Sequence, residues 1–171
     1  MTRVDKWGDP DARLVEVQKH GKFAVLTLTN GRFNGYTHRM MRQIDDAVLD
    51  ARFDSEVEII ILTGAGKMFC AGAEIKMLEQ SDPVGKYYFC LHANETMSRL
   101  EQTPKLTIAA LNGHAVGGGL EVALACDLRV ANSGAGRVGL PEVKLGVLPG
   151  TGGTQRLARA LGKSRALEMM I

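Results

Sequence analysis

Three consecutive glycines, Gly117 to Gly119, constrain this chain more than any other stretch of its sequence. They follow an apolar run that ends at Leu111 and come directly before another apolar segment. Glycine has no Cβ, so three in a row allow the backbone of a strand-to-helix turn to approach another molecule closely. The helix that follows would point its free N–H groups and its positive dipole end at that molecule. Glu121, on the first turn of this helix, would place a carboxylate at the same point, a combination that suits chemistry on a carbonyl compound.

Length and composition indicate one ordinary globular domain. The chain has 171 residues, of which 45% are hydrophobic and 23% charged; both values are typical of soluble proteins. Its 21 basic and 19 acidic residues nearly balance and form no Lys/Arg block, which argues against a nucleic-acid binder. No apolar run approaches a membrane-spanning length, so we expect a soluble protein without membrane association.

Cysteine usage and the two ends of the chain suggest where the protein resides and how it is organised. The three cysteines lack paired spacing, which favours a reduced, cytoplasmic protein. The first ten residues lack the apolar core of a secretory signal and carry acids that a mitochondrial transit peptide would avoid. We expect an N-terminal arm at residues 1–13 and one core domain at residues 14–171. Because no helix stop signal precedes Ile171, we expect this core domain to be incomplete at its C-terminus.

Hydrophobic periodicity predicts an α/β domain with a mostly parallel sheet. Alternating runs at residues 14–19 and 23–28 predict a β-hairpin. Apolar residues recur at helical spacing after Thr37, the expected N-cap of the first helix. The β-branched run at residues 57–62 predicts a strand buried on both faces. Further expected elements are a helix from residue 83 to about 102, strands at 106–111 and 127–131, and a helix from residue 155.

A second glycine-containing stretch, Gly64 to Lys67, superficially resembles a nucleotide-binding loop. A P-loop requires Ser or Thr after its lysine, and Met68 follows here. The dinucleotide pattern requires glycine where Phe69 stands. We therefore interpret these glycines as a turn at the end of a strand.

The small residues from Cys70 to Ala73 form another segment with exposed backbone. Taken alone, such a segment is more often a tight turn before a helix than a binding site. Here, however, it resembles the triple-glycine stretch in following a buried strand. Two such segments together indicate backbone N–H groups that converge on one oxygen atom, as in an oxyanion hole.

Two glutamates are candidates for acid–base chemistry. A lone glutamate at the position of Glu121 or Glu142 is usually a helix-dipole partner or a solvated loop charge. Beside glycine-lined backbone, the two together can perform general acid–base catalysis, with pKa values raised by a dry pocket. The four histidines are scattered without ligand spacing, so we expect no metal site. No serine lies in a nucleophile-elbow sequence.

Four stretches, taken together, resemble the signatures of the crotonase (enoyl-CoA hydratase/isomerase) superfamily. They occur in the family's order, and the resemblance extends from about residue 14 to the end of the chain. The stretches are residues 69–75, 112–121, 141–146 and 149–157. The resemblance implies a crotonase-like spiral of repeated ββα units and an acyl-CoA thioester substrate. Coenzyme A would be part of the substrate, and no separate cofactor would be needed.

The resemblance also implies a role for individual residues. Ala73 and Gly118 would supply the two backbone N–H groups of the oxyanion hole. Glu121 would act as the base toward the β-carbon and Glu142 would supply the α-proton. Because both acids are present, the resemblance favours an enoyl-CoA hydratase, a hydro-lyase that adds water syn across the double bond. Further substrate or CoA contacts are implied for Arg32, Ala71, Gly72, Ile75, Lys76 and Gly117.

Other functions within the same resemblance stay open. One is another crotonase-type reaction on an acyl-CoA, an isomerisation or a dehydration. Another is a truncated, non-catalytic subunit that binds CoA. Full-length relatives continue with helices that cover the acyl pocket and help to form trimers, so a full-length protein would be a homo-oligomer, a trimer or a dimer of trimers.

Overall fold

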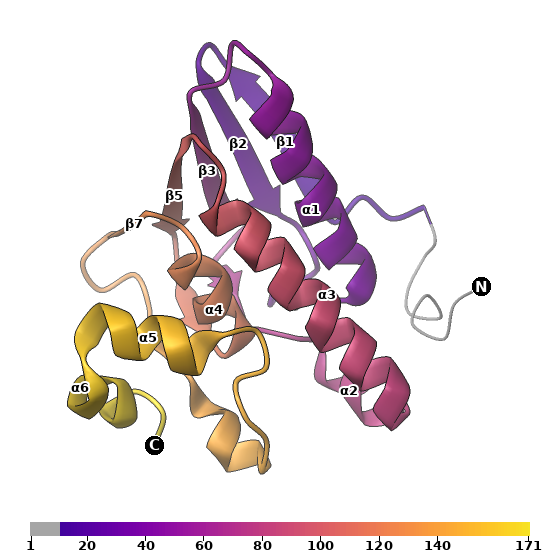
Figure 1. The fold of residues 1–171 in the computed structure, drawn as a ribbon, viewed down its shortest axis with the longest axis vertical. Coiled ribbons are helices and arrows are strands. Elements are labelled where there is room, and N and C mark those ends of the chain that lie inside the picture. Colours follow the sequence, from indigo (N-terminus) through magenta and orange to yellow (C-terminus); the bar gives the residue numbers. More distant parts are fainter. Residues whose placement is uncertain (1–10) are drawn as a thin grey trace.

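A computed structural model describes residues 11–171 (Figure 1). A five-stranded sheet has the order β1-β2-β3-β5-β7. Strands β1 (Val15–His20) and β2 (Phe23–Leu28) form an antiparallel hairpin. Strands β3 (Ile59–Gly64), β5 (Leu106–Leu111) and β7 (Leu128–Ala131) extend it with parallel pairings only. The predicted hairpin and the mostly parallel sheet are therefore confirmed.

A second, smaller sheet contains β4 (Met68–Cys70), β6 (His114–Val116) and β8 (Val138–Gly139), all paired in parallel. The sequence predicts none of these three short strands. Each one follows a strand of the larger sheet, β4 and β6 after a tight corner and β8 after a longer loop. At two corners a side chain has no space, because a Cβ on Gly64 would overlap the Met68 carbonyl oxygen and one on Gly113 would overlap that of Lys67. Two strands, one from each sheet, followed by a helix form the repeating ββα unit.

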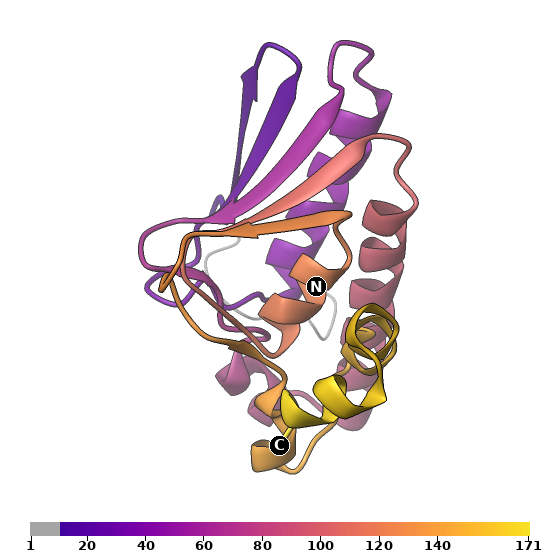
Figure 2. The same ribbon diagram turned by 90° about the vertical axis from the view of Figure 1, so that its left-hand side faces the viewer.

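The helices complete these units. Figure 2 shows the two long helices, α1 (His38–Phe53) and α3 (Pro83–Glu101), on the same side of the large sheet. Thr37 caps α1, as predicted, by accepting a hydrogen bond from the Met40 N–H at 3.3 Å. The remaining helices are α2 (Ile75–Gln80), α4 (Gly118–Leu124), the 3₁₀ helix η1 (Pro141–Leu145), α5 (Gly153–Leu161) and α6 (Lys163–Glu168).

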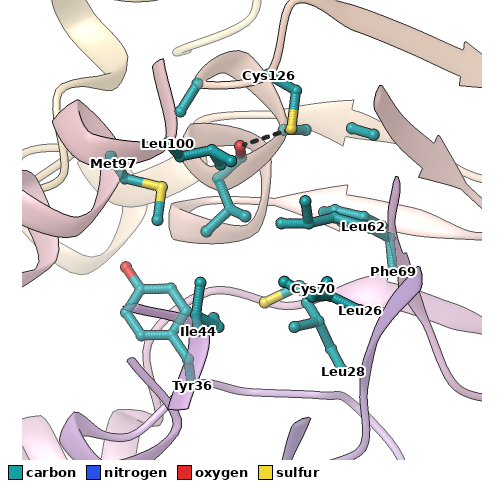
Figure 3. Packing of buried hydrophobic residues seen from close by; sticks show 14 of the residues in the cluster. Leu26, Leu28, Tyr36, Ile44, Leu62, Phe69, Cys70, Met97, Leu100 and Cys126 are labelled. Carbon is teal, nitrogen blue, oxygen red and sulfur yellow. Dashed lines mark hydrogen bonds between the residues drawn. The ribbon is translucent and has the colours of Figure 1, made fainter. Parts of the chain in front are cut away.

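The hydrophobic core lies between the large sheet and the long helices (Figure 3). Ile60 and Leu62 of β3 are fully buried there, whereas Ile59 and Ile61 on the opposite face are only partly buried. The prediction that both faces of this strand are buried is wrong, because α1 and α3 cover the same face (Figure 2).

Two further predictions concern the start of the chain and membranes. Most of the expected arm, residues 1–13, lies outside the described residues. The Ala12 carbonyl, near its end, accepts a hydrogen bond from the Gln43 side chain of α1 at 2.9 Å. Within residues 11–171, no helix is long and apolar enough to cross a membrane.

A polar cluster joins α1 to α3. Asp45, largely buried on α1, accepts two hydrogen bonds from the Arg99 guanidinium of α3, at 2.6 and 2.7 Å. The His92 ring lies 3.7 Å from the same carboxylate and 5.2 Å from the His38 ring, measured between ring centroids. Burial lowers the pKa of His92, and the neighbouring His38 lowers it further, against the opposite effect of Asp45.

This cluster predicts a loss of stability at mildly acidic pH. The pKa of His92 is lower in the folded chain than in the unfolded chain, so the unfolded state binds a proton more readily. Stability should therefore fall as the pH drops from about 6.5, the ordinary histidine value, through the lower folded pKa. Replacing His92 with Gln should reduce this loss, which urea unfolding at a series of pH values will measure. The exposed His20→Gln variant should behave as the parent; equal pH slopes for His92→Gln and the parent would contradict the prediction.

Candidate active site

One cavity of about 150 Å³ lies where the ends of the small sheet meet α3, α4 and η1. Its walls come from segments far apart in the sequence. The lining residues are Tyr36, Ala71, Gly72, Ala73, Ile75, Leu78, Phe89, Cys90, Val116, Gly117, Gly118, Glu121, Pro141, Glu142, Leu145, Val147, Leu148, Gly150 and Thr151.

The first wall is the segment that follows β4. The Tyr36 N–H donates to the Gly72 carbonyl at 2.9 Å, and the Glu74 N–H donates to the Tyr36 carbonyl at 3.0 Å. This single parallel bridge uses the residues on either side of Ala73. In a parallel ladder the residue between two such bonds points its own N–H the other way. The Ala73 N–H is therefore free of this bridge.

The second wall is the triple-glycine turn. Helix α4 begins at Gly118, whose N–H belongs to the first turn and has no acceptor within the helix. A Cβ on Gly72 would lie 2.9 Å from the Gly118 nitrogen, so the two segments are in direct contact. A Cβ on Gly118 itself would overlap the Tyr36 hydroxyl. The structure thus brings together the two segments that carry the predicted oxyanion donors, Ala73 and Gly118.

Glu121 is buried, with only 1% of its surface exposed. Its Oε1 accepts hydrogen bonds from the N–H groups of Thr151, at 2.8 Å, and Gly153, at 2.7 Å. Both donors lie at the start of α5, where free N–H groups and the helix dipole favour an anion. Burial raises the pKa of Glu121, while these N–H groups, the Thr151 side chain and Arg156 oppose that rise. The carboxylate therefore has a fixed orientation and a reduced tendency to ionise, as suits a general base.

Glu142 has a different environment. It is the second residue of η1, where the sequence predicted a loop. Its Oε1 would lie 3.0 Å from a Cβ on Gly117, so the carboxyl group lies against the triple-glycine turn. Among the described residues its buried Oε2 has no hydrogen-bond partner. Burial raises the pKa of Glu142, and the negative charge of Glu121 raises it further. These conditions favour a protonated carboxyl group, a potential proton donor.

Two predicted contact residues lie elsewhere. Ala71, Gly72, Ile75 and Gly117 line the cavity, but Lys76 is an exposed residue of α2 outside its lining. Arg32 borders a separate cavity of about 580 Å³ together with Phe33, Lys67 and His114. Any contact of Lys76 or Arg32 with a ligand stays a prediction.

The structure also adds residues to the site that the sequence did not single out. Thr151 and Gly153 hold the Glu121 carboxylate, and Tyr36, Phe89 and Cys90 form part of the cavity wall. The glycines around Thr151, directly before a helix, were a usable signal, since free N–H groups at such a position bind anions. Tyr36 had no comparable signal, because its side-chain partner, Thr151, is 115 residues away.

Comparisons with known proteins place the chain in a family. Residues 18–171 match the family model described as Enoyl-CoA hydratase/isomerase. The chain is 42% identical over 158 residues to the short-chain-enoyl-CoA hydratase of Clostridium acetobutylicum, covering 91% of this chain and 60% of that protein. It is 38% identical over 156 residues to the crotonyl-CoA hydratase of Syntrophomonas wolfei, covering 90% of this chain and 60% of that protein.

A solved structure shares the fold. The enoyl-CoA hydratase structure from Geobacillus kaustophilus matches with a TM-score of 0.90 and 46% identity, over 93% of this chain and 61% of that one. This match confirms the predicted spiral of ββα units. The chain spans about 60% of the length of the curated relatives described above.

The contacts of Glu121 predict opposite effects for two substitutions. Glu121→Gln keeps an oxygen acceptor for Thr151 and Gly153 and removes a buried charge, so its stability at pH 7 should equal or exceed the parent's. Glu121→Leu leaves two buried N–H groups without a partner, at a cost of about 1–3 kcal/mol each. Chemical denaturation at pH 7 will measure both free energies of unfolding. Equal values for the two variants would show that the two N–H contacts contribute nothing.

Proposed function

Because the chain belongs to the enoyl-CoA hydratase/isomerase family, we propose that it catalyses the syn addition of water to 2-enoyl-CoA thioesters. The observation that carries this proposal is the presence of Glu121 and Glu142 on one cavity, beside two backbone segments with free N–H groups. Relatives about 40% identical to this chain are named as enoyl-CoA hydratases, which supports the same reaction.

In the proposed reaction the thioester oxygen lies between the N–H groups of Ala73 and Gly118. Negative charge develops on this oxygen when the β-carbon is attacked, and the two donors stabilise it. Removing one donor from such a pair typically slows a reaction by about 10²–10³-fold. Because the donors belong to the backbone, the site requires small residues there: side chains at Gly72 or Gly118 would collide with the opposite wall.

The water molecule lies between the two glutamates. Glu121 removes one proton from it as its oxygen bonds to the β-carbon, and Glu142 gives its own proton to the α-carbon. The substrate thereby gains one hydroxyl group and one hydrogen, which together make one water. Burial disfavours ionisation of both carboxyl groups, and the charge of Glu121 disfavours that of Glu142, which supports Glu142 as the group that carries the proton.

The remaining part of the substrate would occupy the surface around the cavity. We propose that the pantetheine arm passes Ala71, Gly72 and Ile75, and that Lys76 and Arg32 approach the phosphates of coenzyme A, which is part of the substrate. Three free cysteines support a reducing compartment, which we propose to be the cytoplasm.

A homo-oligomer, a trimer or a dimer of trimers, is part of the same proposal. Apolar side chains near the cavity stay exposed, namely Ile75, Leu145, Val147 and Leu148. Such a patch is typical of a surface that another protein segment covers.

The reaction is tested by hydration of crotonyl-CoA, followed through the loss of the enoyl absorbance. Glu121→Gln and Glu142→Gln should each lower kcat by at least about 10³-fold, because each removes one step of proton transfer. Binding of CoA, measured by calorimetry, should persist in both. The exposed Glu58→Gln variant, which loses only a surface ion pair with Lys22, should keep the parent's rate.

Two results would overturn the assignment. A double variant, Glu121→Gln with Glu142→Gln, that hydrates crotonyl-CoA as fast as the parent would exclude these residues. If the parent binds CoA but turns over no enoyl-CoA, the protein is a non-catalytic CoA-binding subunit and not an enzyme.

A further inference from the structure

Tyr36 has no role in the reaction proposed above, yet it contacts both oxyanion segments and Thr151, which holds Glu121. It lies in the loop before α1, only 2% exposed, and its ring forms part of the cavity wall. The ring stacks on Phe89 of α3, with 5.7 Å between centroids (Figure 3 shows Tyr36 within the packed interior). Burial, and then the negative charge of Glu121, raise the pKa of the Tyr36 phenol well above its usual value. The hydroxyl group therefore keeps its proton.

The backbone of Tyr36 fixes one oxyanion segment and its side chain abuts the other. Its N–H and carbonyl form the bridge to Gly72 and Glu74 that flanks Ala73. Its hydroxyl occupies the space that any side chain at position 118 would need. Tyr36 thus sets the spacing between the two walls.

The Tyr36 hydroxyl also connects to Glu121 through Thr151. Tyr36 Oη lies 3.1 Å from Thr151 Oγ1, and the Thr151 N–H donates a hydrogen bond to Glu121 Oε1 at 2.8 Å. The Tyr36 hydroxyl is thus linked to Glu121 through a single residue, whose side chain it contacts and whose backbone N–H holds the carboxylate.

We propose that Tyr36 is a positioning residue, which anchors Thr151 so that the Thr151 N–H keeps the Glu121 carboxylate aligned with the two oxyanion donors. The catalytic meaning of this role rests on the proposed hydratase function. Because Tyr36 acts through Thr151, its hydroxyl affects the carboxylate without touching it.

Other groups also face Glu121 and must be held constant. Glu142 and Cys90 lie on the same cavity, and Arg156 of α5 is near its carboxylate. Tyr36→Phe alters none of them, since it keeps the ring and removes one oxygen atom. Tyr87→Phe, which makes the same change on the exposed face of α3, is the matched control.

The experiment is a ¹³C NMR titration of the glutamate carboxyl groups, with the Glu121 signal assigned through Glu121→Gln. The pKa of Glu121 should rise in Tyr36→Phe, because Thr151 loses its contact with Tyr36 and its N–H then supports the ionised form less well. Thr151→Val should raise it as well, and adding Tyr36→Phe to Thr151→Val should change nothing further. Thr151→Ser and Tyr87→Phe should keep the parent's value.

This titration requires no turnover, so it is decided separately from the hydratase assignment. An unchanged pKa in Tyr36→Phe, or additive effects in the double variant, would overturn the positioning role even if the parent is an active hydratase. A folded parent without hydratase activity would instead overturn the proposed function and leave the titration result valid.

Kinetics add a readout that a merely structural role would not produce. In Tyr36→Phe, kcat should fall about threefold to tenfold, the worth of one hydrogen bond, with KM near the parent's. The acid limb of the kcat/KM profile should move to higher pH with the Glu121 pKa. If Tyr36→Phe has a lower melting temperature but an unchanged pH profile, Tyr36 contributes only to packing.

Discussion

The burial of one carboxylate organises the second half of this structure. Glu121 is almost completely removed from solvent, which for an uncompensated charge costs several kcal/mol. The compensation comes from N–H groups at the start of α5, so this helix must cross the first turn of α4. Gly153 is needed for that approach, since a Cβ there would lie 2.8 Å from Glu121 Oε1. Thr151 therefore both holds the Glu121 carboxylate and forms part of the cavity wall.

The corners between the two sheets place the rest of the site. Gly64 and Gly113 allow the chain to leave the large sheet and enter the small one where no side chain would fit. Parallel pairing then brings the carboxyl ends of β4 and β6 to the same end of the small sheet. The segments that follow these two strands carry Ala73 and Gly118. Their contact across the cavity is therefore a consequence of the repeated ββα unit.

Much of this architecture was predictable because local sequence patterns determine it. The alternating and helical patterns predict the hairpin, the long helices and the large sheet. The glycine segments and the two acids are recognisable in the sequence itself. The small sheet has no such signal, since strands of two or three residues show no period and depend on distant partners. The same reason hid the Tyr36–Thr151 contact. Arg32 and Lys76 lie outside the lining of the main cavity, and their contact with coenzyme A stays a prediction.

The two glutamates are identical side chains in different surroundings. Glu121 has one oxygen held by two N–H groups, contacts that favour its ionised form. Glu142 has a buried oxygen without a partner and the charge of Glu121 nearby, conditions that favour its protonated form. Burial raises the pKa of both carboxyl groups, so it is the contacts and not the burial that distinguish them. The proposal that Glu121 is the base and Glu142 the acid rests on this difference, the helix start behind Glu121 against the nearby charge at Glu142.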